Sequence, residues 1–255
     1  MLKKKLLSLL KILFWGSPLI FWLGWQLVLL RPTALWLLLV VSLFLLVGWA
    51  YEVVGYRIGW RLLFTFTGPA LLVSSFYLFI SLLALPWLIQ FFWLLLVLYL
   101  YRYFRLARLI GQSQDKGEWS QAVLYGGLVT VFLASASLFG LQAFLSLSPW
   151  PLLAALSVVL LINTRTVAYA QGWNGAGELW LWPGLSLLVT EIAMMLSLMP
   201  LNYLIAGILS ALAYYSAINF LRLYLTNKLS GRKIRNYAWF TAVSLAIILL
   251  TARWL

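Results

Sequence analysis

The sequence predicts an all-α protein, a polytopic bundle of about nine transmembrane helices. Three observations lead to this prediction. First, 65% of the 255 residues are hydrophobic and only 9% are charged, whereas a soluble domain is about 45–50% apolar and about a quarter charged. Second, the apolar residues form continuous runs of about 20 residues, the length that a helix needs to cross a bilayer. Third, most of the basic residues lie between these runs.

The predicted spans follow one another with short connections. We therefore expect residues 1–255 to form a single transmembrane domain, in which the longest connection, 105–120, is a cytoplasmic loop. The nine spans lie near 12–30, 33–54, 62–84, 86–104, 121–146, 151–171, 179–199, 201–225 and 237–253.

The first span could be mistaken for a secretory signal peptide, because Lys3, Lys4 and Lys5 precede an apolar stretch. However, the stretch continues to Leu30 without a small-residue cleavage pattern, and another span follows at once. We therefore expect an uncleaved first helix.

Proline marks the connections on the outer side. It lacks an amide donor and is disfavoured inside helices, so a tight helix–proline–helix turn is the natural interpretation. The first eight spans are expected to form four such hairpins, and a single final helix follows them. The prolines in question are Pro32, Pro86, Pro149 with Pro151, and Pro200.

A second proline lies inside the leading span of three hairpins, at Pro18, Pro69 and Pro183. Pro69 precedes Pro86 by 17 residues, and Pro183 precedes Pro200 by the same distance. This spacing suggests a repeated unit of four helices, in a 4+4 arrangement. Interrupted helices of corresponding repeats line the substrate site in many transporters. The alternative is that Pro and Gly are simply frequent in membrane helices.

The basic residues orient the chain. With the N-terminus in the cytoplasm, all of the 18 Lys and Arg residues except Arg31 and Arg253 fall on the inner side, as the positive-inside rule requires. The C-terminus is then extracytoplasmic. Membrane topology and anionic phospholipid explain the net charge of +13 better than nucleic acid does. Six residues in two clusters are expected to bind lipid headgroups: Arg102, Arg105, Arg108, Arg232, Lys233 and Arg235.

The reactive side chains indicate a protein without catalytic residues, metal ligands or cofactor. The chain contains no Cys and no His, and it has only five acids. A zinc site needs His, Cys or clustered carboxylates, and a serine nucleophile needs an activating base, usually His. We therefore do not expect an enzyme.

One acid is expected deep in the membrane. Glu191 precedes Pro200 by nine residues, about 13 Å along a helix, and ionisable groups at such depth indicate function by default. Arg165 also lies within a span, deep enough to need a partner or to extend its side chain toward the headgroups. With Ser210 and Tyr214, these two residues form the candidate intramembrane polar site. Two roles are open: a proton site in transport, or a hydrogen bond that only joins neighbouring helices.

Small side chains indicate where helices touch, because they let backbones approach closely in lipid. We expect them to mark contacts inside the bundle, the alternative being a homodimer face. They are Ala206, Gly207, Ser210, Ala211, Ala213 and Ala217 in one span, and Ala136 and Gly140 in another.

The last third of the chain carries Glu191, Pro200-Leu-Asn202, Tyr214-Tyr215 and Thr251-Ala-Arg-Trp254. In these residues it resembles a family of uncharacterised multi-pass inner-membrane proteins of bacteria. That family has no established activity. The resemblance therefore implies a location in the bacterial inner membrane and nothing about chemistry.

Two functions follow as hypotheses. The first is a transporter-like or permease-like protein, with its site near Glu191 and the Pro/Gly-interrupted first, third and seventh spans. The second is a structural or accessory protein that binds anionic lipid or a partner subunit. A central polar cavity that reaches Glu191 would favour the first. A solid apolar interior with a peripheral ninth helix would favour the second. The sequence leaves substrate, coupling ion and oligomeric state open.

Overall fold

A computed structural model gives the structure of the protein and describes residues 34–53, 60–82, 86–110, 116–173, 180–226 and 230–251. These ranges contain eight α-helices, and they confirm the all-helical prediction. The first predicted span, 12–30, lies outside them. The helices are α2 (Ala34–Val53), α3 (Trp60–Ile80), α4 (Pro86–Ile110), α5 (Lys116–Leu145), α6 (Pro149–Gln171), α7 (Leu181–Ser197), α8 (Tyr203–Leu225) and α9 (Gly231–Thr251).

Five of the described helices, α3, α4, α5, α6 and α8, are long and apolar enough to cross a membrane. α7 is also apolar but shorter, at 17 residues, the lower limit of the usual range for a spanning helix. The protein is therefore an integral membrane protein. The helix bounds differ most from the prediction at 105–120, where α4 and α5 extend until only 111–115 separate them. Arg, Leu, Lys and Glu are good helix formers, so both helices continue through the polar residues expected to form a loop.

Short connections join the described hairpins as predicted. Pro86 begins α4 and Pro149 begins α6, the position at which a missing amide donor costs no helical hydrogen bond. Pro200 lies between α7 and α8, and the Asn202 side chain then caps α8 by accepting a hydrogen bond of 2.9 Å from the amide of Leu204. Pro32 lies outside the described residues.

The internal prolines occupy different positions in their helices. Pro69 lies within an α3 that continues on both sides. Pro183, in contrast, lies in the first turn of α7, ahead of Gly184, whose amide bonds the carbonyl of Trp180. Pro183 therefore does not interrupt α7, because the first-turn amides of a helix have no partner within it. These two prolines give the 4+4 repeat no support, and the repeat stays a prediction.

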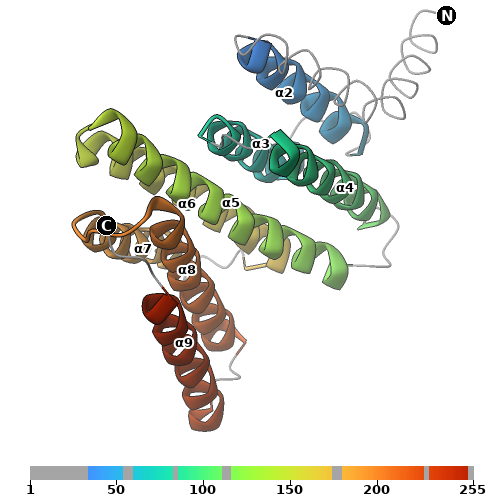
Figure 1. The fold of residues 1–255 in the computed structure, drawn as a ribbon. Coiled ribbons are helices and arrows are strands. Elements are labelled where there is room, and N and C mark those ends of the chain that lie inside the picture. The colour runs from blue at the N-terminus through green and yellow to red at the C-terminus, as the bar shows by residue number, and fades with distance from the viewer. Residues whose placement is uncertain are drawn as a thin grey trace, which may run out of the picture.

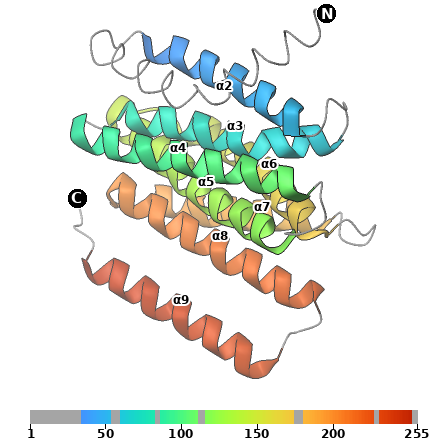
Figure 2. The same ribbon diagram turned by 90° about the vertical axis from the view of Figure 1, so that its right-hand side faces the viewer.

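α5 is the central helix of the bundle. It packs against α3, α4, α6 and α8, whereas α2 packs on α3 and α4, and α9 packs on α8. The two views show α2 and α9 at opposite edges of the bundle (Figures 1 and 2). The position of α9 at an edge agrees with one of the two criteria stated for the accessory role.

The helices α5 and α8 come into close contact at two of the predicted small residues. A Cβ atom added to Gly207 would lie 2.7 Å from the Cβ of Ala136 and 3.0 Å from its backbone. The neighbouring Ala206 and Ser210 are also buried. The expectation of a contact inside the bundle is confirmed for Gly207 and Ala136, whereas Ala213 and Ala217 line a groove between α7, α8 and α9.

We predict that Gly207→Ala lowers the free energy of unfolding by about 1–3 kcal/mol, because the added methyl overpacks a contact with backbone. Gly117→Ala is the matched control, since nothing lies within 4 Å of a Cβ at that position. Thermal unfolding of the two purified variants measures the difference. Equal melting temperatures for both would contradict the close contact.

Candidate functional site

An apolar groove of about 840 Å³ lies between α7, α8 and α9. It forms because α9 packs chiefly against α8, so one side of α8 remains uncovered between its two neighbours. Leu181, Leu185 and Leu188 follow one another at helical spacing along the α7 wall. Ala213 and Ala217 stand on α8, and their small side chains leave the space open. A second groove, of about 530 Å³, lies on the other side of α9 against α5 and α8.

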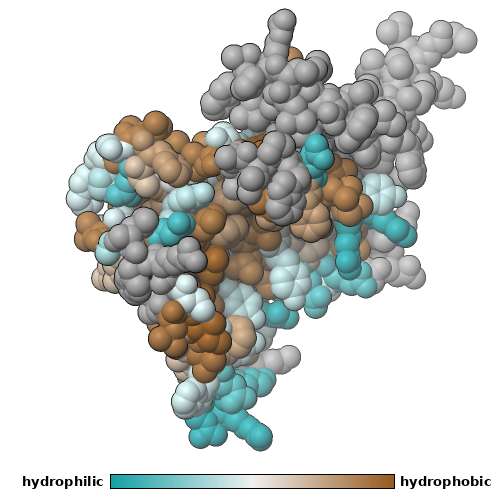
Figure 3. All heavy atoms as spheres, in the orientation of Figure 1, coloured by the Kyte–Doolittle hydropathy of each residue, from teal (hydrophilic) through white to brown (hydrophobic). Residues whose placement is uncertain are grey.

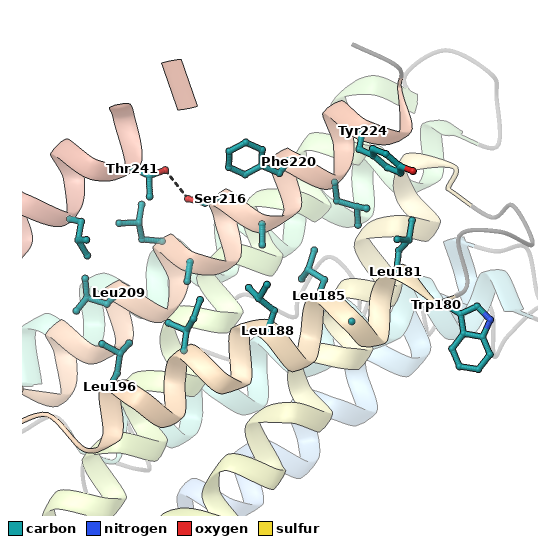
Figure 4. Close-up of a pocket in the computed structure, with 17 residues that line it drawn as sticks. Trp180, Leu181, Leu185, Leu188, Leu196, Leu209, Ser216, Phe220, Tyr224 and Thr241 are labelled. Atoms are coloured by element: carbon teal, nitrogen blue, oxygen red, sulfur yellow. Dashed lines mark hydrogen bonds between the residues drawn. The ribbon is translucent and has the colours of Figure 1, made fainter. Parts of the chain in front are cut away.

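The few polar side chains of the larger groove do not face a free cavity. Ser216 and Thr241 bond each other at 3.0 Å across α8 and α9, as the dashed line in Figure 4 shows. Tyr224 and Trp180 lie together at one end of the groove, away from Leu196 and Leu209 at the other (Figure 4). None of the described residues that line it is charged. The groove therefore suits a hydrocarbon chain rather than a polar solute.

Basic side chains gather at the end of the bundle where α8 ends and α9 begins. Arg222 is exposed near the end of α8, and Arg232, Lys233 and Arg235 are exposed at the beginning of α9. Hydrophilic side chains mark the lower tip of the molecule at this place (Figure 3). In the other predicted headgroup cluster, Arg102 and Arg105 are exposed on α4, and the side chain of Arg108 lies outside the described residues.

Two aromatic rings lie against the Arg165 side chain. Its guanidinium carbon lies 4.1 Å from the centre of the Trp182 ring on α7 and 5.6 Å from that of Phe64 on α3. Phe64 in turn stacks on Tyr169 with ring centres 4.5 Å apart. The cation–π interaction of an Arg with an aromatic face contributes about 0.5–2 kcal/mol of favourable free energy. The half-buried cation thus joins α3, α6 and α7.

Glu191 lies apart from the other predicted site residues. It is exposed, on the same face of α7 as Leu187, and nine residues, about 13 Å of helix, separate it from the Trp182 that holds Arg165. Within the described residues Glu191 and Arg165 do not form an ion pair. Ser210 and Tyr214 are instead fully buried on α8. The predicted four-residue site is not assembled.

A polar junction that the sequence interpretation missed lies among α5, α6 and α8. The side-chain amide of Asn163 donates to the Gly127 carbonyl at 3.1 Å and to the Tyr214 hydroxyl at 3.2 Å. Gly127 permits this approach, because a Cβ there would lie 3.0 Å from the Asn163 amide oxygen. The sequence feature that indicates this junction is the lone Asn163 within the apolar run that precedes Arg165. Ser210 only bonds its own helix, at the Ala206 carbonyl.

Comparison of the chain with protein-family models, with curated proteins and with solved structures finds no match. The groove, the basic residues and the placement of the polar groups are therefore the features that indicate function.

We predict that Asn163→Leu lowers the free energy of unfolding by about 1–2 kcal/mol, because it removes hydrogen bonds from one helix to two others. Ser157→Ala is the control, since the Ser157 hydroxyl bonds only the Leu153 carbonyl of its own helix. A double-mutant cycle with Tyr214→Phe measures the coupling across α6 and α8. Strictly additive effects would show that the Asn163–Tyr214 bond contributes nothing.

Proposed function

We propose that the protein is an accessory membrane protein that binds an anionic phospholipid, with a lipid chain in the groove between α7, α8 and α9. The observation that carries this proposal is the groove itself, which is large, open and walled by apolar side chains. Apolar surface of this kind accepts hydrocarbon without leaving a polar group unpaired.

The dimensions of the groove support a lipid chain. From Leu181 to Leu196 its α7 wall measures about 22 Å, at about 1.5 Å per residue, and therefore follows most of the hydrocarbon thickness of about 30 Å. Trp180 and Tyr224 lie at the same end of the groove (Figure 4), and the exposed Arg222 precedes Tyr224 by two residues at this end of α8. Such side chains favour the headgroup level, where the ring is buried and the polar atom stays hydrated.

Charge supports the choice of an anionic headgroup. Arg232, Lys233 and Arg235 are exposed in the first turns of the helix that forms one wall of the groove. Each basic residue near an anionic leaflet contributes about 1 kcal/mol to the free energy of binding to the lipid headgroups. Arg222 lies at the same end of the neighbouring helix and adds to the positive potential.

Transport was the first hypothesis from the sequence, and the placement of polar groups supports it less well. Ionisable residues on a transport pathway face the bundle interior or a water-filled cavity, whereas Glu191 is exposed on the outer surface. Pro183 does not break α7, so the expected interrupted helix is absent from this described segment. The accessory role needs neither feature.

We further propose nine spans in a bacterial inner membrane, with the N-terminus in the cytoplasm and the C-terminus outside. The chain lacks cysteine, so single introduced cysteines report topology without background. We predict that Ser148→Cys, between α5 and α6, reacts with an impermeant maleimide on intact cells. Ser230→Cys, between α8 and α9, should react only after permeabilisation. The reverse pattern would invert the orientation.

We predict that Ala217→Trp fills the groove and abolishes lipid retention. Native mass spectrometry of protein from nanodiscs containing phosphatidylglycerol measures the retained lipid. Ala155→Trp, at an exposed position on α6, is the control and should retain lipid like the parent protein.

The charged end is tested in the same assay. Replacing Arg232, Lys233 and Arg235 with Gln should reduce the preference for phosphatidylglycerol over phosphatidylcholine. Replacing Arg102 and Arg105 with Gln is the control, and it should leave the preference at the groove unchanged. Equal lipid retention by Ala217→Trp and Ala155→Trp would overturn the proposed function.

A further inference from the structure

Glu191 is a carboxyl group on the outer surface of a membrane bundle. Its neighbours on that surface are apolar: Leu187 is 60% exposed, Leu188 50% and Met195 63%. Glu191 lies six residues before the end of α7, about 9 Å by helix rise, and therefore within the hydrocarbon layer. Acidic residues at such depth almost always face the bundle interior or pair with another group.

The rest of this chain offers Glu191 no such partner among the described residues. α7 packs chiefly on α6 and α8, and the residues it buries there include Trp182, Val189 and Ala193. At 100° of rotation per residue, Glu191 points away from this buried face. Arg165, the nearest cation on α6, is held by the Trp182 ring.

The outward face of α7 has the form of a helix-packing seam. Gly184, Leu187, Glu191, Met195 and Leu198 are all exposed and are spaced by three, four, four and three residues, the spacing that places side chains on one face of a helix. Nothing lies within 4 Å of a Cβ placed on Gly184. This glycine lets a second helix approach closely in the same seam.

We propose that two copies of this chain associate through the outward faces of α7, and that their Glu191 carboxyls hydrogen-bond each other. A two-fold axis along the membrane normal brings each residue near its own counterpart, so the two acids meet at the same depth. In this pair the O–H of one carboxyl donates to the carbonyl oxygen of the other. A second copy supplies this partner without any further component, and a single polar residue in an apolar helix–helix contact is a known determinant of register.

Cysteine cross-linking in native membranes tests the seam. Because the chain contains no cysteine, Leu187→Cys and Met195→Cys should each give a disulfide-linked dimer of twice the chain mass. Val158→Cys on α6 is the matched control, since Val158 is 55% exposed against 60% for Leu187, and it should give little. Equal cross-linking at Val158, a monomer at both seam positions, or a product of another mass would each overturn the proposal.

The role of Glu191 is tested in the Leu187→Cys background. Glu191→Gln keeps the hydrogen-bonding capacity and should preserve the dimer, whereas Glu191→Leu should weaken association about tenfold. Because Glu191 is exposed in the single chain, neither variant should change the melting temperature of dissociated protein. Undiminished dimer with Glu191→Leu would refute the carboxyl pair. The groove variant Ala217→Trp should dimerise like the parent, which separates this proposal from lipid binding.

Discussion

The hydrocarbon of a bilayer offers no hydrogen bond, and this constraint determines most of the structure. Backbone groups are satisfied within the helices, so side chains with polar atoms must find partners on neighbouring helices. Ser42 and Tyr77 join α2 to α3 at 3.0 Å, and Thr67 and Thr166 join α3 to α6 at the same distance. Asn163 joins α6 to both α5 and α8. These bonds and the small-residue contact at Gly207 hold the bundle where lipid and protein are equally apolar.

The same constraint explains why the groove can exist. An apolar surface has no unpaired group, so α9 can stand away from α7 without a penalty in hydrogen bonding, and lipid chains can fill the space. Where α8 and α9 do carry hydroxyls at their contact, Ser216 and Thr241 pair with each other. The edge helix is thus held by one short polar contact and leaves apolar walls on both sides.

Properties that depend on position along the chain could be predicted from the sequence. The helices, their proline turns and the small residues at Gly207 follow from hydropathy, missing amide donors and side-chain size. Properties that depend on rotation about a helix axis could not be predicted. The sequence suggests a pair of Glu191 and Arg165 because both are polar and deep, yet they lie on different faces and at different levels. It also predicts an interruption at Pro183, because hydropathy does not locate the first residue of a helix to within one turn.

The two ionisable groups within the spans show why the helix bundle can include helices of more than one chain. Arg165 is long enough to extend toward the headgroups, and as a cation it is attracted to the negative faces of Trp182 and Phe64. Glu191 has neither option, because its side chain is short and aromatic faces repel an anion. A carboxyl in hydrocarbon must therefore meet a donor. Since α7 turns Glu191 away from the described helices of its own chain, that donor is best supplied by a second protein surface at the same depth.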